Sequence, residues 1–243
     1  MLNSNIGDGL LARPEPAVIV GRSGDLRPWL WLWFPLLWLF AILLALNLDP
    51  DFYVRWFLYE DGLVEIGTAV LALTATVVGG LALRHRRRLP ARWLAGWLLA
   101  VTAACFYFGM EEISWGQKVF QWDTPEWVAA FNDQGETNLH NTSGLFDQLP
   151  RNLLMLWVIA GGIVAPILAR IRGKALEPPM FWPTYVCLPT AVLAIATRIP
   201  DYLSWLSLPF SIRIDSGEVK EFYYALFLLL YLLSFWVRLR RTR

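Results

Sequence analysis

The side chains best suited to chemistry lie in one stretch, residues 111–141, which reads EEISWGQKVFQWDTPEWVAAFNDQGETNLHN. It begins with two carboxylates at the end of an apolar run and closes with the segment QGETNLHN. In that closing segment Glu136 and His140 share a face whether the chain is helical or extended, and Asn138 joins them if it is extended. A carboxylate and an imidazole are the minimum for general acid–base catalysis near neutral pH, so we predict catalytic roles for Glu111, Glu136 and His140.

The same three side chains form a candidate metal site. Glu111, Glu136 and His140 would give a divalent cation an oxygen-rich set of ligands with one nitrogen. A histidine in a loop is also commonly a hydrogen-bonded structural residue. The structural interpretation of His140 therefore stays open beside the catalytic and metal-binding ones.

Glu111 needs a partner in any fold in which it ends a membrane span. The dipole at the C-terminal end of a helix opposes a negative charge, so a cation, a proton or hydrogen-bond donors must stabilise this carboxylate. We expect the segment that follows to fold back and bring Glu136 and His140 to Glu111. Apolar burial of Trp127 and Phe131 would dock it.

Polar residues near other expected helix ends would support this site. Asp61 and Glu65 are four residues apart, and Glu218 and Glu221 are three apart, so each pair shares a helix face. A carboxylate in the first turn of a helix is also stabilised by the helix dipole, and capping is the alternative role. Glu65 lies within a span, where a charge is costly, and Arg198 is its expected partner. The supporting residues are Glu65, Glu112, Gln117, Asn138, Asn141, Arg198, Glu218 and Glu221.

The elements that must position these residues are membrane spans. Of the 243 residues, 56% are hydrophobic and 17% are charged, whereas about a quarter are charged in an ordinary soluble domain. We therefore predict an all-α, polytopic transmembrane bundle. Since the formal net charge is only +1, nucleic acid is not an expected partner. The expected partners are the lipid bilayer and a lipid or lipid-linked substrate, and Cys105 and Cys187, both in apolar runs, should be core residues.

Six apolar runs are candidate spans because each approaches the length of about 20 residues that crosses a bilayer. They cover residues 29–47, 63–83, 93–110, 153–169, 182–196 and 222–237. Together they form one membrane domain, residues 29–238, between a mobile tail, residues 1–28, and a basic tail, residues 239–243. The last two spans are shorter than the ideal length, so they would tilt less, draw in flanking residues or thin the bilayer.

The longest connection is the outer loop, residues 111–151. Gly116 offers a left-handed stop to the third span. Thr124, Pro125 and Glu126 mark the start of a helix, with a cap, a proline at the first helical position and an early acid. We expect a short amphipathic helix there, with its aromatic side chains towards lipid or the bundle.

The distribution of charge predicts the orientation of the chain. With the N-terminus in the cytoplasm, 15 of the 21 Lys and Arg residues lie in cytoplasmic segments, and 16 of the 20 acidic residues lie on the outer side. Basic residues favour the cytoplasmic side of membrane proteins. We therefore expect both termini in the cytoplasm and the polar site on the outer face.

The segments EEISWGQ, TPE and QGETNLHN, preceded by EDG-x-x-E before an earlier span, resemble those of an uncharacterised group of bacterial multi-pass membrane proteins. This resemblance implies a bacterial inner-membrane location and no mechanism. The Glu111–Glu112 pair is also similar to the EExxxR motif of CAAX-type intramembrane proteases. Here Gly116 stands where that motif has arginine, and no histidine follows His140, so the similarity ends at the glutamates.

Two functions of different classes stay open. The first is an enzyme at the outer membrane face that performs acid–base or divalent-metal chemistry on a lipid or lipid-linked substrate. The second is a non-catalytic scaffold or transporter subunit in which the same polar groups lock the outer loop onto the bundle. The spans contain no midplane charge, which weighs against an ion-coupled carrier.

The charge distribution leads to a direct test of orientation. Single cysteines introduced at Arg86 and Arg172 should react only with membrane-permeant thiol reagents in intact cells, whereas a cysteine at Glu136 should also react with impermeant ones. Impermeant labelling at Arg86 or Arg172 would contradict the predicted topology.

Overall fold

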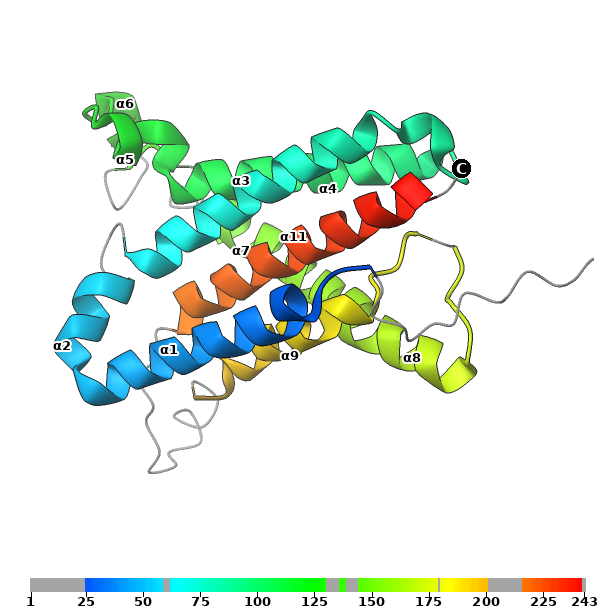
Figure 1. Ribbon diagram of the computed structural model, residues 1–243. Helices are drawn as coiled ribbons and strands as arrows, with labels where there is room; N and C mark the ends of the chain where they lie inside the picture. Colours follow the sequence, from blue (N-terminus) through cyan, green and yellow to red (C-terminus); the bar gives the residue numbers. More distant parts are fainter. Residues whose placement is uncertain are drawn as a thin grey trace, which may run out of the picture.

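The structure, a computed structural model, describes residues 25–58, 62–129, 136–138, 144–178, 180–200 and 216–241. Every regular element within these ranges is a helix, and none is a strand (Figure 1). The predicted all-α class is confirmed. In chain order the helices are η1 (Trp29–Trp33), α1 (Phe34–Leu48), α2 (Pro50–Tyr53), η2 (Val54–Leu58), α3 (Leu63–Leu83), η3 (Arg86–Arg88), α4 (Trp93–Glu112), η4 (Ser114–Gly116), α5 (Gln117–Phe120), α6 (Glu126–Ala129), α7 (Gly144–Trp157), η6 (Val158–Val164), α8 (Ala165–Arg172), η7 (Tyr185–Cys187), α9 (Leu188–Ala196) and α11 (Ser216–Arg241).

Five helical stretches of the described chain are long and apolar enough to cross a membrane, and they contain α1, α3, α4, α7 with α8, and α11. They fit a membrane-embedded protein. The predicted count of six is not confirmed, because the remaining apolar helix covers only Tyr185–Ala196. Twelve residues of helix extend about 18 Å, well short of a hydrocarbon core of about 30 Å.

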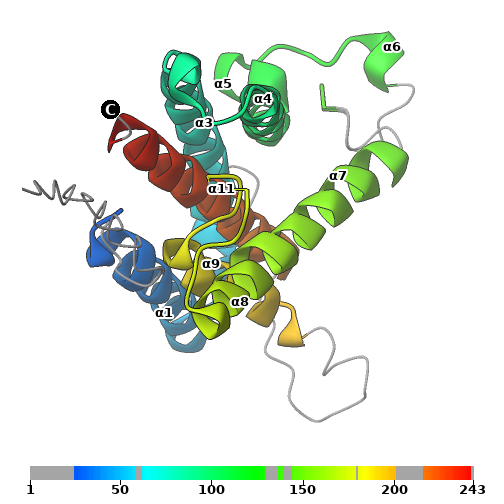
Figure 2. The same ribbon diagram turned by 90° about the vertical axis from the view of Figure 1, so that its right-hand side faces the viewer.

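α11 is the central helix of the bundle. In its most apolar stretch 78% of the residues are buried, against 22–39% in the other four long helices. A helix that is apolar on all sides is stable only when other helices surround it. α11 packs against α3 and α9, and Figure 2 shows it between the other helices.

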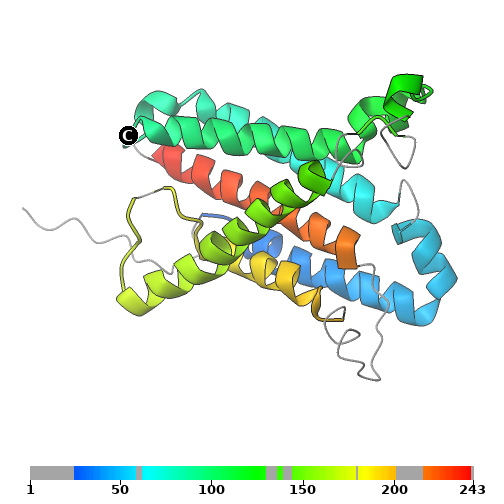
Figure 3. The same ribbon diagram turned by 180° about the vertical axis from the view of Figure 1, so that it is seen from behind.

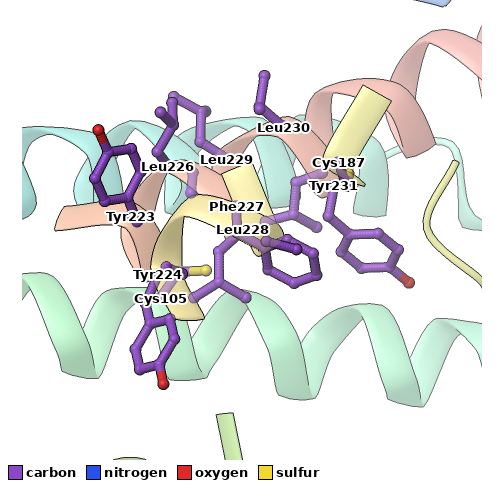
Figure 4. Close-up of a cluster of buried hydrophobic side chains, with 14 of the residues drawn as sticks. Cys105, Cys187, Tyr223, Tyr224, Leu226, Phe227, Leu228, Leu229, Leu230 and Tyr231 are labelled. Carbon is purple, nitrogen blue, oxygen red and sulfur yellow. The ribbon is translucent and has the colours of Figure 1, made fainter. Parts of the chain in front are cut away.

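The core forms around α11. Figure 4 shows labelled side chains of α11, between Tyr223 and Tyr231, in one cluster with Cys105 and Cys187, which come from α4 and η7. Both cysteines are free and buried, so the expectation that they are core residues is confirmed. Large apolar side chains on the outer helices, among them Phe40, Val70 and Leu99, are exposed, as expected for a surface that contacts lipid.

Tyrosine hydroxyl groups connect α11 to its neighbours. Tyr231 accepts a hydrogen bond from Trp97 Nε1 at 2.8 Å and donates one to the carbonyl of Phe181 at 2.9 Å. Tyr223 donates to the carbonyl of Pro35 at 2.9 Å. A buried hydroxyl without a partner is costly, so these bonds favour one position of α11 in the bundle.

The bundle has two chemically different ends (Figure 1). At one end α4 finishes and α3 and α11 begin, and at the other end α3, α8 and α11 finish. The second end carries three basic clusters: Arg86, Arg87 and Arg88; Arg170 and Arg172; Arg238, Arg240 and Arg241. The candidate chemical residues of α3, α4 and α11 lie at the first end.

Two helices begin earlier than the predicted spans. α7 begins at Gly144 and not at 153, which shortens the predicted outer loop, and α11 begins at Ser216 and not at 222. A span predicted from hydropathy ends at its first charged residues. A helix in the folded protein continues through polar residues when one of its faces remains apolar. The added turns carry Arg151, Glu218 and Glu221, which matter for the site.

The predicted amphipathic helix of the outer loop is represented by α6, with four residues after Thr124 and Pro125. The side chain of Trp127 is 73% exposed, so the expectation that it docks the loop by burial is wrong. An indole ring at the membrane interface is stabilised by contact with lipid headgroups, and Trp127 is free to make that contact. Phe131 lies outside the described residues.

Close packing of α3 against α4 predicts different outcomes at two adjacent glycines. A Cβ at Gly79 would overlap the Thr102 side chain, including its Cβ at 3.0 Å, whereas a Cβ at Gly80 would meet no atom within 4 Å. Thr102 is held by its hydrogen bond to the Leu98 carbonyl at 2.7 Å. Gly79→Ala should therefore lower the free energy of unfolding by about 1–3 kcal/mol.

Gly80→Ala is the matched control for thermal unfolding in detergent micelles. It makes the same change in helix propensity, which favours alanine by about 1 kcal/mol, and should leave stability unchanged or higher. Equal melting shifts in the two variants would contradict the close approach of α3 and α4.

Candidate functional site

The site is built on a sharp turn at the end of α4. After Glu112 the chain enters η4, in which Ser114 (φ 47°), Trp115 (φ 56°) and Gly116 (φ 101°) all have left-handed backbone conformations. The predicted left-handed stop at Gly116 is confirmed. A residue other than glycine in this region costs about 1–3 kcal/mol, so contacts of Ser114 and Trp115 must stabilise the turn.

Trp115 provides the first of these contacts. Its Nε1 donates a hydrogen bond to Glu111 Oε1 at 2.5 Å, and its ring packs edge-on against Phe106 and Tyr107 at centroid distances of 6.3 Å. Glu111 is only 4% exposed, and the dipole of α4 opposes its charge. The predicted need of this carboxylate for a donor is therefore met within its own turn, by Trp115.

Ser114 provides the second contact, across to the returning loop. Its hydroxyl donates to Glu136 Oε2 at 2.7 Å, and Asn138 Nδ2 donates to the same oxygen at 2.7 Å. Asn138 is 2% exposed. The described part of the returning loop, residues 136–138, thus lies against the end of α4, where Glu136 bonds to Ser114 and Glu111 bonds to Trp115.

Lys118 joins the loop to α3. Its ammonium group forms an ion pair with Glu65 and lies 3.4 Å from Glu136 Oε1. The described structure places the cation of Lys118 against Glu65, and the predicted pairing of Glu65 with Arg198 stays a prediction. Lys118 lies in α5, which follows the left-handed turn, and both Ser114 and Lys118 contact Glu136.

Gln117 holds the two sides of the loop together. Its Oε1 accepts a hydrogen bond from the backbone of Thr137 at 2.6 Å, and its Nε2 donates to Thr124 Oγ1 at 2.7 Å. Nε2 also donates to the carbonyl of Trp122 at 3.2 Å. We call Glu65, Ser114, Gln117, Lys118, Glu136 and Asn138 the anchoring network, because their polar bonds dock the loop where apolar burial was expected.

A separate group of carboxylates lies beside the anchoring network. Oxygen atoms of Glu112, Glu218 and Glu221 all lie within 4.8 Å of one another, and we call these residues the carboxylate trio. Glu112 ends α4, and the other two lie in the first turns of α11. Arg151 of α7 approaches the trio, with Nε 3.1 Å from Glu221 Oε1.

Five carboxylates gather in this region: those of the trio, Glu65 and Glu136. Lys118 forms ion pairs with Glu65 and Glu136, and Arg151 forms one with Glu221. Carboxylates this close repel one another unless a proton or a cation neutralises them. The trio therefore has the chemistry of a cation site.

The pKa of Lys118 reflects its place between two carboxylates. Burial lowers this pKa, but the hydrogen bond and charge of Glu65, together with those of Glu136, outweigh burial and raise it above its ordinary value of 10.5. Lys118 is therefore a permanent cation at physiological pH.

The structure brings the described members of the predicted set together in two groups. Glu65, Gln117, Glu136 and Asn138 meet in the anchoring network, and Glu112, Glu218 and Glu221 meet in the trio. Glu111 is bonded to Trp115. His140 and Asn141 lie outside the described residues, so the metal set of Glu111, Glu136 and His140 stays a prediction.

Four contributing residues were not predicted: Ser114, Trp115, Lys118 and Arg151. The sequence carries a signal for two of them, since Lys118 and Arg151 are among the six basic residues expected on the acidic outer side. A cation in an acidic segment is a natural ion-pair partner. Ser114 and Trp115 act through a left-handed turn, for which the sequence offers only Gly116.

Comparison of the chain with protein-family models, with curated proteins and with solved structures found no match. The resemblance to a group of bacterial multi-pass membrane proteins therefore stays a prediction.

The position of Lys118 predicts strong coupling to Glu65. Lys118→Met leaves two part-buried carboxylates facing each other and should lower the free energy of unfolding by about 1–3 kcal/mol, below the value for fully buried pairs because these side chains are partly exposed. Adding Glu65→Gln should restore part of that loss. Thermal unfolding of both single variants and the double variant measures the coupling, with Lys174→Met, at an exposed lysine, as control.

The pH dependence separates this ion pair from a packing effect. Because the pKa of Lys118 is raised in the folded protein, its stabilisation is complete below the ordinary value of 10.5 and is lost as the pH rises through the higher folded value. The stability difference between wild type and Lys118→Met should stay constant up to about pH 10 and shrink above 10.5. A pH-independent difference, or additive effects of Glu65→Gln and Lys118→Met, would contradict the pairing.

Proposed function

We propose that this protein is an inner-membrane protein of bacteria that binds a divalent cation at the carboxylate trio and uses it on a lipid or lipid-linked substrate. The observation that carries the proposal is the approach of three carboxylates from two helices to within 4.8 Å. A cation between them would reduce the repulsion among the three carboxylates.

The spacing of the trio suits a hard cation with oxygen ligands. Ca²⁺–oxygen distances of about 2.3–2.6 Å allow two ligand oxygens to lie up to about 4.6–5.2 Å apart, and the trio's oxygens lie within 4.8 Å of one another. Mg²⁺, with distances of about 2.0–2.1 Å, allows at most about 4.2 Å. Carboxylates alone favour Ca²⁺, Mg²⁺ or Mn²⁺ over the softer metals.

A lipid substrate is supported by the surface next to the trio. The segment that follows Lys118 exposes Val119, Phe120 and Trp122, and the rings of Phe120 and Trp122 stack at 5.9 Å. Exposed aromatic residues at a membrane interface contact the headgroup region. A lipid headgroup there would lie beside the ends of α4 and α11, where a bound cation would polarise a phosphate or carbonyl oxygen.

The chain's own groups would have distinct roles in this chemistry. Glu112, Glu218 and Glu221 would hold the cation, and Arg151 would orient Glu221 through their ion pair. The anchoring network would keep the loop at one place beside the trio. His140 and Glu111 remain proposed acid–base residues because of their types and positions in the sequence.

The orientation follows from the separation of charge between the two ends of the bundle. The three basic clusters lie together at the end opposite the trio. Because basic residues favour the cytoplasmic side, this arrangement supports cytoplasmic termini and a trio at the outer membrane face.

A second function, a non-catalytic scaffold or transporter subunit, is favoured by the anchoring network. Glu65, Lys118 and Glu136 are already paired with one another, which is typical of a structural lock. In this case the trio would hold protons or rely on Arg151, and it would retain no metal.

Cation binding predicts that a chelator destabilises the protein. Addition of Ca²⁺ or Mn²⁺ at 100 times its Kd should raise the free energy of unfolding by about 2.7 kcal/mol, and EDTA should reverse the gain. Glu218→Gln should lower the affinity for Mn²⁺ about tenfold or more, measured by electron paramagnetic resonance of free Mn²⁺. Glu126→Gln, at an exposed acid of α6, should leave it unchanged.

A gain in stability on Glu218→Gln, instead of a loss, would identify the protein as a non-catalytic scaffold. Without a bound cation, Glu218→Gln removes repulsion within the trio and should stabilise the protein, and neither EDTA nor added Ca²⁺, Mg²⁺ or Mn²⁺ should shift its melting temperature. That combination would overturn the proposed cation site.

A further inference from the structure

A pocket of about 460 Å³ lies at the basic end of the bundle. Figure 3 shows the segment beside it, where the chain leaves α8 and turns back towards α9. Its wall is formed by η6 and α8, and the returning segment with Leu176 and Trp182 faces that wall. This pocket is separate from the carboxylate trio, which lies at the other end.

The wall changes from apolar to cationic along one helix face. Ala160, Val164, Leu168 and Arg172 all line the pocket, and residues four apart share a face of a helix. From Ala160 to Arg172 the helix extends about 18 Å, slightly more than half of a hydrocarbon core of about 30 Å. The row therefore runs from inside a membrane span to its charged end.

The mouth of the pocket carries a positive charge. Arg172 and Lys174 line it together with one acid, Glu177, which leaves a net charge of +1. Arg170, exposed on the same last turn of α8, adds to the local positive field. The C-terminal dipole of α8 opposes an anion there, and these basic residues offset it. Guanidinium and ammonium groups together suit a phosphate.

The mouth is also held in shape. Trp182 Nε1 donates a hydrogen bond to the carbonyl of Glu177 at 2.9 Å, and the Trp182 ring stacks on Trp157 at 5.9 Å with an interplanar angle of 22°. Phe181 packs on both rings and accepts the hydrogen bond of Tyr231 through its carbonyl. A pocket held in this way loses little conformational freedom on binding.

We infer that this pocket binds an anionic phospholipid of the surrounding bilayer. The phosphate would lie at Arg172 and Lys174, and one acyl chain would lie along Ala160, Val164 and Leu168. A zwitterionic lipid would bring its own positive charge to the two cations, and a soluble phosphate would leave the apolar wall unfilled. Basic pockets at the ends of membrane helices bind anionic headgroups for the same reason.

Competition between two lipids tests the inference on the full chain in detergent. Native mass spectrometry with phosphatidylglycerol and phosphatidylcholine of identical acyl chains should show preferential retention of phosphatidylglycerol. In the Arg172→Gln/Lys174→Gln variant the preference for phosphatidylglycerol over phosphatidylcholine should fall about 25-fold, since each cation near an anionic lipid raises its affinity about fivefold. Leu168→Trp should fill the apolar wall and lower retention of both lipids.

The matched control is Arg86→Gln/Arg87→Gln, which removes two charges at the same end of the bundle but outside the pocket. It should keep the preference, and thermal unfolding of all variants verifies that they are folded. Equal retention of the two lipids by wild type, or equal losses in the two double variants, would overturn the inference. Displacement of phosphatidylglycerol by an equal concentration of glycerol phosphate would do so as well, because it would mean that the acyl chain adds no affinity.

Discussion

Burial of α11 on all sides is the constraint on which the rest of the structure depends. Its most apolar stretch is 78% buried, so its few polar groups must either find partners in the core or lie at the helix ends. The hydroxyl groups of Tyr223 and Tyr231 take the first course. Glu218 and Glu221 take the second, and because α4 ends where α11 begins, Glu112 lies against them.

The left-handed turn after α4 also determines the structure of this end of the bundle. Two residues other than glycine adopt left-handed conformations there, which is unfavourable unless their side chains compensate. Trp115 bonds to Glu111 within the turn, and Ser114 bonds to Glu136 across it. The strained turn and the returning loop therefore stabilise each other, and Lys118 adds an ion pair to each of Glu65 and Glu136.

The sequence predicted the helical elements well, because apolar runs and their flanking charges are local signals. α3 covers the predicted residues, and α4 extends two residues beyond them, to Glu112. Six spans were predicted because hydropathy does not distinguish the short helix Tyr185–Ala196 from a spanning one. The prediction omitted the polar first turns of α7 and α11, because a span predicted from hydropathy ends at its first charged residues.

The sequence predicted many residues of the candidate site, but it did not predict the contacts between them. Glu112, Glu218 and Glu221 were all expected to support the site, but their convergence depends on helices that are more than a hundred residues apart in the chain. Lys118 was not expected as the partner of Glu65, because a pairing across 53 residues needs the turn at Gly116 to place it. Such contacts depend on tertiary packing, which residue spacing does not encode.

The two groups of carboxylates differ in how their charge is balanced, and this difference links structure to function. Glu65 and Glu136 share Lys118 and accept hydrogen bonds within the anchoring network, so their positions are already stabilised. The trio brings three carboxylates close to one another, and Arg151 pairs with Glu221. Repulsion among carboxylates falls when a cation enters, whereas a satisfied ion pair gains nothing from one. The carboxylates that hold the loop and those suited to bind a cation are therefore different residues.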